Sequence, residues 1–225
     1  MLEDGKKLHA ENPDYYYMNT DTKILCEYVL RPYLRQMTGE SFIIDSEKKM
    51  SFTRDQLVEV LTYIKDCYDG GVFEPAEDSA TFKGQIHTNP KWMDGKFVFA
   101  YGPSSSINLL MDAVPEAECI VVQMPMAKDR INDGFFADTP QYMTVNKNSE
   151  HVEEAVDFLN YFYNSAEAQE TLKDVRSIPP TSTARQLCAD KGLLNQTVVD
   201  AVDLAAGLNG KSDKGYTTSA EVYAI

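Results

Sequence analysis

Short apolar segments with strand character alternate along this sequence with longer segments of helical periodicity. The clearest helical segment runs from about Arg54 to Asp69, with apolar residues at positions 57, 60, 61, 64 and 68 on one helix face. Thr53 and Gln56 have the spacing of a capping box, and Gly70-Gly71 is suited to closing the helix. This alternation predicts an α/β fold, in which helices pack on a sheet.

The other expected elements follow from the same signals. The segment from Phe97 to Tyr101 is continuously apolar and ends at Gly102-Pro103, so we expect a strand that is buried on both faces. Strands or extended segments are also predicted over 15–19, 41–45, 119–124 and 135–145. Helices are predicted over 22–37, 152–166 (capped by Ser149), 166–173 (capped by Ser165), 183–191 and 196–206 (capped by Asn195).

Length and charge exclude several classes of protein. The 225 residues suffice for one large domain or two modest lobes. The chain has 21 Lys and Arg against 35 Asp and Glu, a net charge of −14, which argues against binding to nucleic acid or to an anionic membrane. No apolar run approaches the ~18 residues that span a bilayer. The first eleven residues carry charge and no apolar core, so we expect no secretion signal within this sequence.

The potential metal ligands are dispersed. Cys26, Cys67, Cys119 and Cys188 form no Cys-x-x-Cys pair, and the three histidines are scattered. We expect four separate, half-buried thiols, with a disulfide as the open alternative. No glycine-rich nucleotide motif is present, so the residues predict neither a metal nor a cofactor.

The turn from Gly102 to Ser106 is the segment that comes nearest to an enzyme motif. In a Gly-x-Ser-x-Gly nucleophile elbow, Ser104 would be the nucleophile, but Ser106 replaces the second glycine. The only downstream histidine, His151, lies on the polar side of a predicted helix. A serine hydrolase acting through Ser104 is therefore the enzyme alternative, and it requires an imidazole beside that serine.

Aromatic residues point to another kind of ligand. The chain holds 13 tyrosines, 10 phenylalanines and one tryptophan. A tyrosine has an apolar face and a hydroxyl, which match the C–H face and the hydroxyls of a sugar. Most of these rings are expected in the core, with Trp92 as a packing anchor, but their number makes a carbohydrate a candidate ligand.

Several segments, in order, carry a family resemblance. Residues 42–73 hold an Asp-containing turn, a helix and the close Tyr68-Asp69-Gly70-Gly71, and residues 92–103 hold Gly95-Lys96, an apolar strand and Gly102-Pro103. Residues 144–180 hold a Lys-x-Ser turn, a Glu-Ala-x-x-Phe-Leu helix, a Ser-x-Glu-x-Gln segment and a Pro-Pro loop. Together they resemble the extracellular solute-binding proteins of bacterial ABC importers, especially the sugar-binding, maltose-binding-protein-like branch.

The resemblance implies a two-lobed α/β protein of the type II periplasmic-binding-protein class. Such a protein closes on a solute by a hinge, passes it to a membrane permease and performs no chemistry. Residues 1–139 would form the second, C-terminal lobe, 140–185 a fragment of the first lobe, and 186–225 the return to the second lobe and a tail. The protein would be extracellular and lipid-anchored, with the lipoprotein signal and most of the first lobe outside this sequence.

That organisation has two consequences for these 225 residues. With half of the solute contacts absent, we expect weak or no solute binding, and a fragment that binds no ligand is a further alternative. An uncovered apolar surface on the first-lobe fragment would favour a homodimer.

Five ligand-binding positions follow from the resemblance. Asp21 lies in a cleft-facing loop after the first strand. Ser104 and Ser106 follow the Gly-Pro pair, where sugar binders often place an aromatic residue, so this departure suggests a smaller sugar or a non-sugar solute. Phe136 and Asp138 lie near the hinge crossing and would supply one ring and one carboxylate. The alternative for each is an ordinary loop residue.

Overall fold

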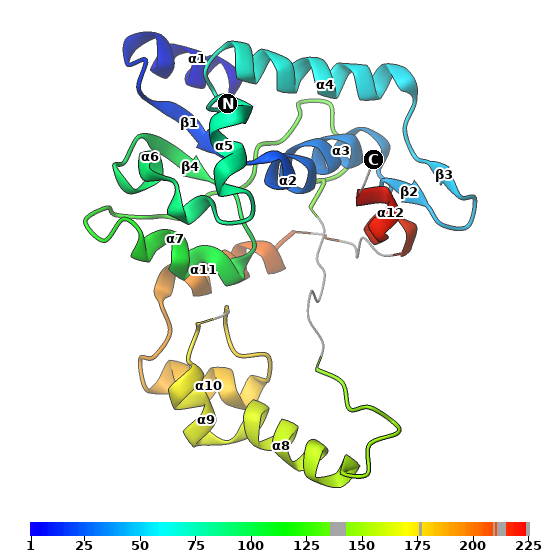
Figure 1. Cartoon of the computed structure of the whole chain (residues 1–225), viewed down its shortest axis with the longest axis vertical. Helices are drawn as coiled ribbons and strands as arrows, with labels where there is room; N and C mark the ends of the chain where they lie inside the picture. The colour runs from blue at the N-terminus through cyan, green and yellow to red at the C-terminus, as the bar shows by residue number, and fades with distance from the viewer. Residues whose placement is uncertain (136–142, 176, 209, 211–214, 224–225) are drawn as a thin grey trace.

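A parallel pair of strands lies on the left side of the larger, upper body in Figure 1. The computed structural model describes residues 1–135, 143–175, 177–208, 210 and 215–223. β1 (Tyr16–Asn19) pairs in parallel with β4 (Phe97–Ala100), with Tyr16 opposite Phe97 and Asn19 opposite Ala100. Parallel strands need a long crossover between them. Here the crossover contains the helices that cover the pair, and the predicted α/β character is confirmed.

The first crossover helix contains a π turn. α2 (Thr22–Leu25), the π-helical η1 (Cys26–Leu30) and α3 (Arg31–Thr38) form one continuous helix, which ends at Gly39 with φ of 77°. Pro32 has no N–H to offer the carbonyl four residues earlier, and a regular helix would be disrupted there. The helix widens instead, and the Arg31 N–H bonds to the Cys26 carbonyl.

The second crossover helix matches its prediction. α4 (Arg54–Asp69) begins with the expected capping box, in which Thr53 Oγ1 accepts from the Gln56 N–H at 3.2 Å and Gln56 Oε1 accepts from the Thr53 N–H at 2.9 Å. The chain turns away at Gly71, whose φ is 67°. Val60 in this helix is fully buried. The core that it joins lies between β1, α3 and α4 and includes Met18, Val29, Leu34, Val72 and Phe73.

The remaining elements are short or lie at the periphery. They are α1 (Leu2–Glu11), β2 (Ile43–Ile44) paired with β3 (Lys49–Met50), α5 (Ala76–Ser79), η2 (Ala80–Phe82), η3 (Ile86–Thr88), α6 (Pro90–Met93), η4 (Ser104–Ser106), α7 (Ile107–Asp112), α8 (Val152–Asn164), α9 (Ala166–Leu172), α10 (Ser182–Asp190), α11 (Gln196–Ala206), η5 (Gly215–Thr218) and α12 (Ala220–Tyr223). Trp92 is buried in α6, and its indole N–H donates to the Leu110 carbonyl at 3.0 Å, as expected of a packing anchor.

The strand predicted over 97–101 is confirmed as β4, but its expected burial on both faces is wrong, since Val98 is 49% exposed. The strand predicted over 119–124 is wrong. The segment 119–124 has no regular structure, and Ile120 is 77% exposed. An apolar segment becomes a strand only where another strand takes up its backbone hydrogen bonds, and this segment pairs with no strand in the part of the chain that the structure describes. Of the extended segment 135–145, residues 136–142 lie outside the described residues.

The predicted cap of α8 is also wrong. The N-cap position is His151, and Ser149 lies two residues earlier, where its Oγ accepts from the His151 N–H at 3.1 Å. The caps at Ser165 and Asn195 are confirmed, because each accepts a backbone N–H of the first turn of its helix.

Helices α8, α9 and α10 pack on one another as the smaller body, drawn at the bottom of Figure 1, and α11 packs on α7 and η4. The predicted lobe boundary between residues 185 and 186 falls inside α10, and the three-part lobe division stays a prediction. Several large apolar side chains of α8 are exposed, namely Val152, Val156, Phe158 and Tyr161. Among the residues described, no helix has the length and apolar character needed to cross a membrane.

Candidate functional site

The chain leaves β1 and β4 at the same edge of the sheet, because parallel strands share a direction. Ligands of open α/β sheets bind outside this carboxyl edge. Thr20 and Asp21 follow β1, and the segment from Tyr101 to Ser106 follows β4. The candidate site is therefore this edge and the cavity beside it.

Asp21 is fully buried, and its carboxylate is engaged by the backbone. Oδ1 accepts from the N–H groups of Lys23 and Ile24 at 2.7 and 2.8 Å, which caps α2. Oδ2 accepts from the Gly84 N–H at 2.6 Å. These bonds give Asp21 a structural role at the sheet edge. Its contact with a solute stays a prediction.

Ser104 and Ser106 lie together in η4. Ser106 Oγ donates to the Pro103 carbonyl at 2.8 Å, and Ser177 Oγ donates to Ser104 Oγ at 2.8 Å. Ser104 thus contacts another hydroxyl, whereas the hydrolase alternative requires an imidazole. His151 is on α8, where it lies 3.6 Å from Glu154. The two remaining candidates, Phe136 and Asp138, lie outside the described residues.

A cavity of about 130 Å³ adjoins Tyr101, immediately after β4. Tyr28 and Tyr101 lie at an interplanar angle of 15° with ring centroids 6.3 Å apart, and Tyr33 meets the edge of Tyr63 at 5.5 Å. We call this the tyrosine pocket. Its lining comes from η1, α3, α4, the segment 124–127, the first residue of the chain and the residue after β4. The lining residues are Met1, Tyr28, Val29, Pro32, Tyr33, Gln36, Tyr63, Tyr101, Met124, Pro125, Met126 and Ala127.

Burial keeps three tyrosines of this pocket, Tyr33, Tyr63 and Tyr101, protonated. It raises the pKa of both Tyr63 and Tyr101, because the phenolate would lose its hydration. Burial also raises the pKa of Tyr33, with a further contribution from the carboxylate of Glu59. The hydroxyls therefore remain neutral groups that can donate or accept a hydrogen bond.

Gln36 fixes the far wall of the pocket. Its side chain is almost fully buried, and Nε2 donates to the carbonyls of Pro125 and Asp133 at 3.1 Å each. Oε1 accepts from the Ala127 N–H at 2.7 Å. Sequence reasoning missed this residue. The available signal was a lone amide on a helix face that is otherwise apolar, four residues after Pro32 and eight after Tyr28.

A polar joint connects the sheet edge to the smaller body. Asn108 Nδ2 donates to the Asp174 carbonyl at 2.9 Å, and Asn195 Nδ2 donates to Asn108 Oδ1 at 3.0 Å. The Asn195 N–H completes the ring by donating to Asp174 Oδ2 at 2.5 Å. Together with the bond between Ser104 and Ser177, this joint ties α7 and η4 to the chain after α9.

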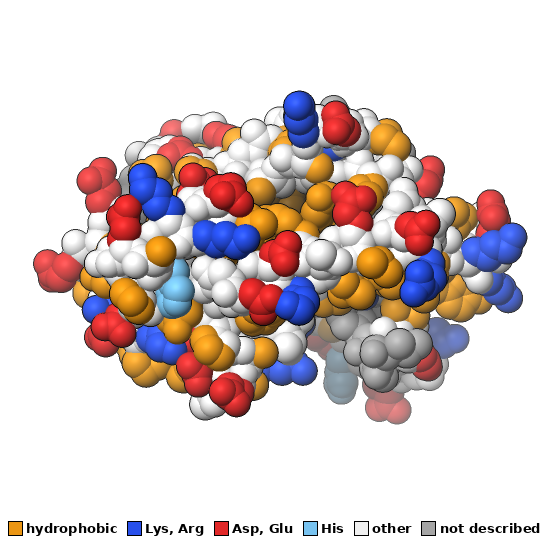
Figure 2. All heavy atoms as spheres, turned by 90° about the horizontal axis from the view of Figure 1, so that it is seen from above, with side chains coloured by type: hydrophobic (Ala, Val, Ile, Leu, Met, Phe, Trp, Pro, Cys, Tyr) orange, Lys and Arg blue, Asp and Glu red, His pale blue; other side chains and the backbone are white. Residues whose placement is uncertain are grey.

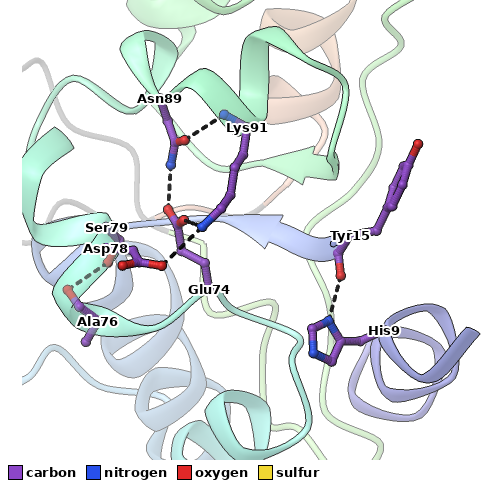
Figure 3. Close-up of polar contacts among 8 residues, drawn as sticks. All are labelled: His9, Tyr15, Glu74, Ala76, Asp78, Ser79, Asn89 and Lys91. Atoms are coloured by element: carbon purple, nitrogen blue, oxygen red, sulfur yellow. Dashed lines mark hydrogen bonds and ion pairs between the residues drawn. The ribbon is translucent and has the colours of Figure 1, made fainter. Parts of the chain in front are cut away.

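Figure 3 shows a second polar cluster, away from the pocket. Glu74 is 1% exposed and accepts from Asn89 Nδ2 at 2.5 Å and from Lys91 Nζ at 2.9 Å. Lys91 also reaches Asp78 at 3.1 Å. Every carboxylate oxygen of Glu74 has a partner, so this cluster holds the crossover together. Within the described ranges, no three side chains of the metal-ligating types converge, and the four cysteines are free thiols, two of them fully buried.

Comparison with known proteins places this geometry in a family. The sequence profile of bacterial extracellular solute-binding proteins matches residues 17–206. A search of curated proteins found no match.

Three solved structures share the fold. A periplasmic oligogalacturonide-binding protein from Yersinia enterocolitica, in complex with saturated digalacturonic acid, is 23% identical with a TM-score of 0.87, over 99% of this chain and 56% of that chain. A de novo designed cysteine esterase is 23% identical with a TM-score of 0.78, over 99% and 56%. A periplasmic solute-binding protein from Pectobacterium atrosepticum is 19% identical with a TM-score of 0.82, over 98% and 57%.

At these identities the structures establish the fold alone. The chain spans a little over half of each of them, which confirms a periplasmic-binding-protein fold with one lobe nearly complete and part of the other. The matched profile extends from β1 to the end of α11 and so includes the sheet edge, the polar joint and every lining residue of the tyrosine pocket except Met1. The chain belongs to the bacterial extracellular solute-binding proteins.

Proposed function

We propose that this chain is the solute-binding component of an ABC importer, which captures a small solute outside the cytoplasmic membrane and delivers it to a permease. The solute proposed is a mono- or oligosaccharide. The observation that carries the proposal is the tyrosine pocket at the carboxyl end of β4, because paired rings and neutral hydroxyls suit a sugar. A lipid anchor is part of the same proposal.

The pocket supplies one wall of the binding site. Its volume of about 130 Å³ is below the ~300 Å³ at which ligand pockets usually begin, so it would hold one sugar ring and leave the opposite side open. A second lobe that closes on that side would complete the contacts. Asp21, Ser104, Ser106, Phe136 and Asp138 are proposed to face the same closing cleft, and no covalent step is required of any of them.

Removing one ring of the stacked pair tests the proposal. We expect Tyr101→Ala to weaken the binding of a neutral monosaccharide or disaccharide by about fivefold to tenfold, as ~1 kcal/mol of ring contact predicts. The measurement is a saturation-transfer NMR titration, which detects the weak binding expected of this chain. Tyr161→Ala is the control, because Tyr161 is exposed on α8 and should leave the affinity unchanged. Equal affinities of wild type and Tyr101→Ala would contradict the proposed site.

Self-association through α8 is a separate proposal. Val156 and Phe158 are more than half exposed on this helix, and water is a poor environment for such a surface. We expect light scattering to give about twice the chain mass of 25.3 kDa, and Val156→Glu together with Phe158→Glu to return the mass to that of one chain. A wild-type chain that stays monomeric at millimolar concentration would rule out the homodimer.

A further inference from the structure

The tyrosine pocket has almost no charge in its lining. Apart from Gln36, the described lining residues are tyrosine, methionine, proline, valine and alanine. The one formal charge among them is the α-ammonium of Met1, which is paired with Asp4 Oδ2 at 3.4 Å. An anionic solute that entered the pocket would therefore meet no free cation in this lining.

The amide of Gln36 is no substitute for a cation. Both of its N–H groups donate to backbone carbonyls, and its oxygen already accepts from a backbone N–H. Binding to a solute carboxylate would require these bonds to break, which would leave buried carbonyl groups unpaired. Each such group costs about 1–3 kcal/mol.

Two arginines on α3 are close in sequence to the lining residues, but their side chains contact groups outside the pocket lining. Arg35 Nη1 donates to the Phe135 carbonyl at 3.3 Å, and its Nη2 donates to Ser41 Oγ at 2.9 Å. The guanidinium of Arg31 lies 5.4 Å from the centre of the Phe42 ring. Both side chains are more than nine-tenths buried. A helix turns by 100° per residue, so each arginine is turned by 100° from the lining residue that follows it, Arg31 from Pro32 and Arg35 from Gln36.

The electrostatic surroundings favour the same conclusion. The carboxylate of Glu59 contributes to the raised pKa of Tyr33, so a negative charge lies near one of the lining rings. The chain as a whole has a charge of −14, and Figure 2 shows acidic side chains spread over the face viewed from above. An incoming carboxylate would be repelled by this field and would also lose hydration without a charged partner.

We propose that the tyrosine pocket selects an uncharged sugar ring and discriminates against the corresponding uronate. The inference rests on the proposed function and specifies its solute class. It separates this chain from the Yersinia protein of the same fold, whose solved complex contains digalacturonic acid.

The test uses ligands that differ at one carbon. Methyl galactopyranoside carries a CH2OH group where methyl galacturonopyranoside carries a carboxylate, and the methyl ester of the latter is uncharged. The affinities of the full chain for these three compounds, and for the matching glucose series, are measured by NMR titration at pH 7 and 0.15 M salt. We expect the neutral sugar and the ester to bind with similar affinity and the uronate at least about fivefold more weakly.

A charge variant connects this preference to the pocket. Glu59→Gln removes the carboxylate beside Tyr33. It should reduce the ratio of the affinity for the neutral sugar to the affinity for the uronate by about twofold. Glu77→Gln removes an exposed charge from α5 and should leave this ratio unchanged. At 1 M salt the difference between the two affinities should also become smaller, because the Debye length falls to about 3 Å.

The outcomes are distinguishable. If the neutral sugar binds and the uronate binds equally well or more tightly, the inference is overturned while the proposed function stands. If neither series binds at tens of millimolar, the proposed function fails and the inference fails with it.

Discussion

Gly134→Ala is expected to destabilise the chain by about 3 kcal/mol and to abolish measurable sugar binding. Gly134 has a φ of 69°, where an alanine costs about 1 kcal/mol. Its new Cβ would overlap the Pro32 carbonyl oxygen and lie 2.6 Å from Gln36 Cγ, and such overpacking adds about 2 kcal/mol. Relief of the overlap would push the segment that contains Gly134 away from α3. The wall of the pocket that Gln36 holds would move with it.

Gly95→Ala is the matched control for this effect. Gly95 has a nearly equal φ of 67°, but a Cβ there meets no atom within 4 Å. Gly95→Ala should lower the free energy of unfolding by only about 1 kcal/mol, the cost of the backbone conformation, and should leave the affinity for sugar unchanged. Urea unfolding gives the free energies, and the titration described for Tyr101 gives the affinities. Equal losses of stability and of sugar affinity in the two variants would show that Gly134 matters only for its backbone conformation.

Lys91→Met is expected to destabilise the chain by about 2 to 3 kcal/mol. It leaves Glu74 buried without its cationic partner, and such losses usually cost about 3–5 kcal/mol. The figure is reduced here because Lys91 is 36% exposed and its charge is partly screened. Lys65→Met is the control, since Lys65 and Asp69 form an ion pair with both side chains more than half exposed. Its loss should leave the free energy of unfolding nearly unchanged, because solvent screens this pair.

The pH dependence of unfolding separates the ion pair from simple packing. Desolvation lowers the pKa of Lys91, but the bonds to Glu74 and Asp78 outweigh it and the net shift is upward from 10.5. The charge of Lys91 therefore makes its full contribution to the free energy of unfolding below pH 10.5. This contribution is lost as the pH rises through the folded-state pKa. The difference in the free energy of unfolding between wild type and Lys91→Met should stay constant from pH 7 to 9 and shrink above pH 10.5. A difference that is unchanged above that pH would mean that only the apolar part of Lys91 contributes.

Local signals predicted the parts of the fold that depend on neighbouring residues. The capping box of Thr53 and Gln56 and the caps at Ser165 and Asn195 each involve residues within a few positions of one another. The segment 119–124 was misassigned because a strand needs a partner, which periodicity alone does not reveal. The exposure of Val98 has a similar origin, since the covering of a sheet face also depends on distant residues and the face that carries Val98 is only partly covered.

The site was less predictable than the fold. The resemblance led to the sheet edge through Asp21, Ser104 and Ser106, and the structure shows their polar atoms engaged with the chain itself. The tyrosine pocket joins five parts of the chain that are distant in sequence, so no local motif marks it. Its tyrosines could be counted among the aromatic residues, but their convergence depends on the tertiary fold.

Hydrogen exchange with and without a neutral sugar tests most directly whether this chain is a solute-binding lobe whose binding site is the tyrosine pocket. With sugar at a concentration that occupies most sites, we predict slower exchange in peptides that cover 26–37 and 124–134. Exchange should be unchanged over 182–190 in α10, and the sugar should be recovered chemically intact. Protection confined to α8–α10, or conversion of the sugar to a product, would contradict the account.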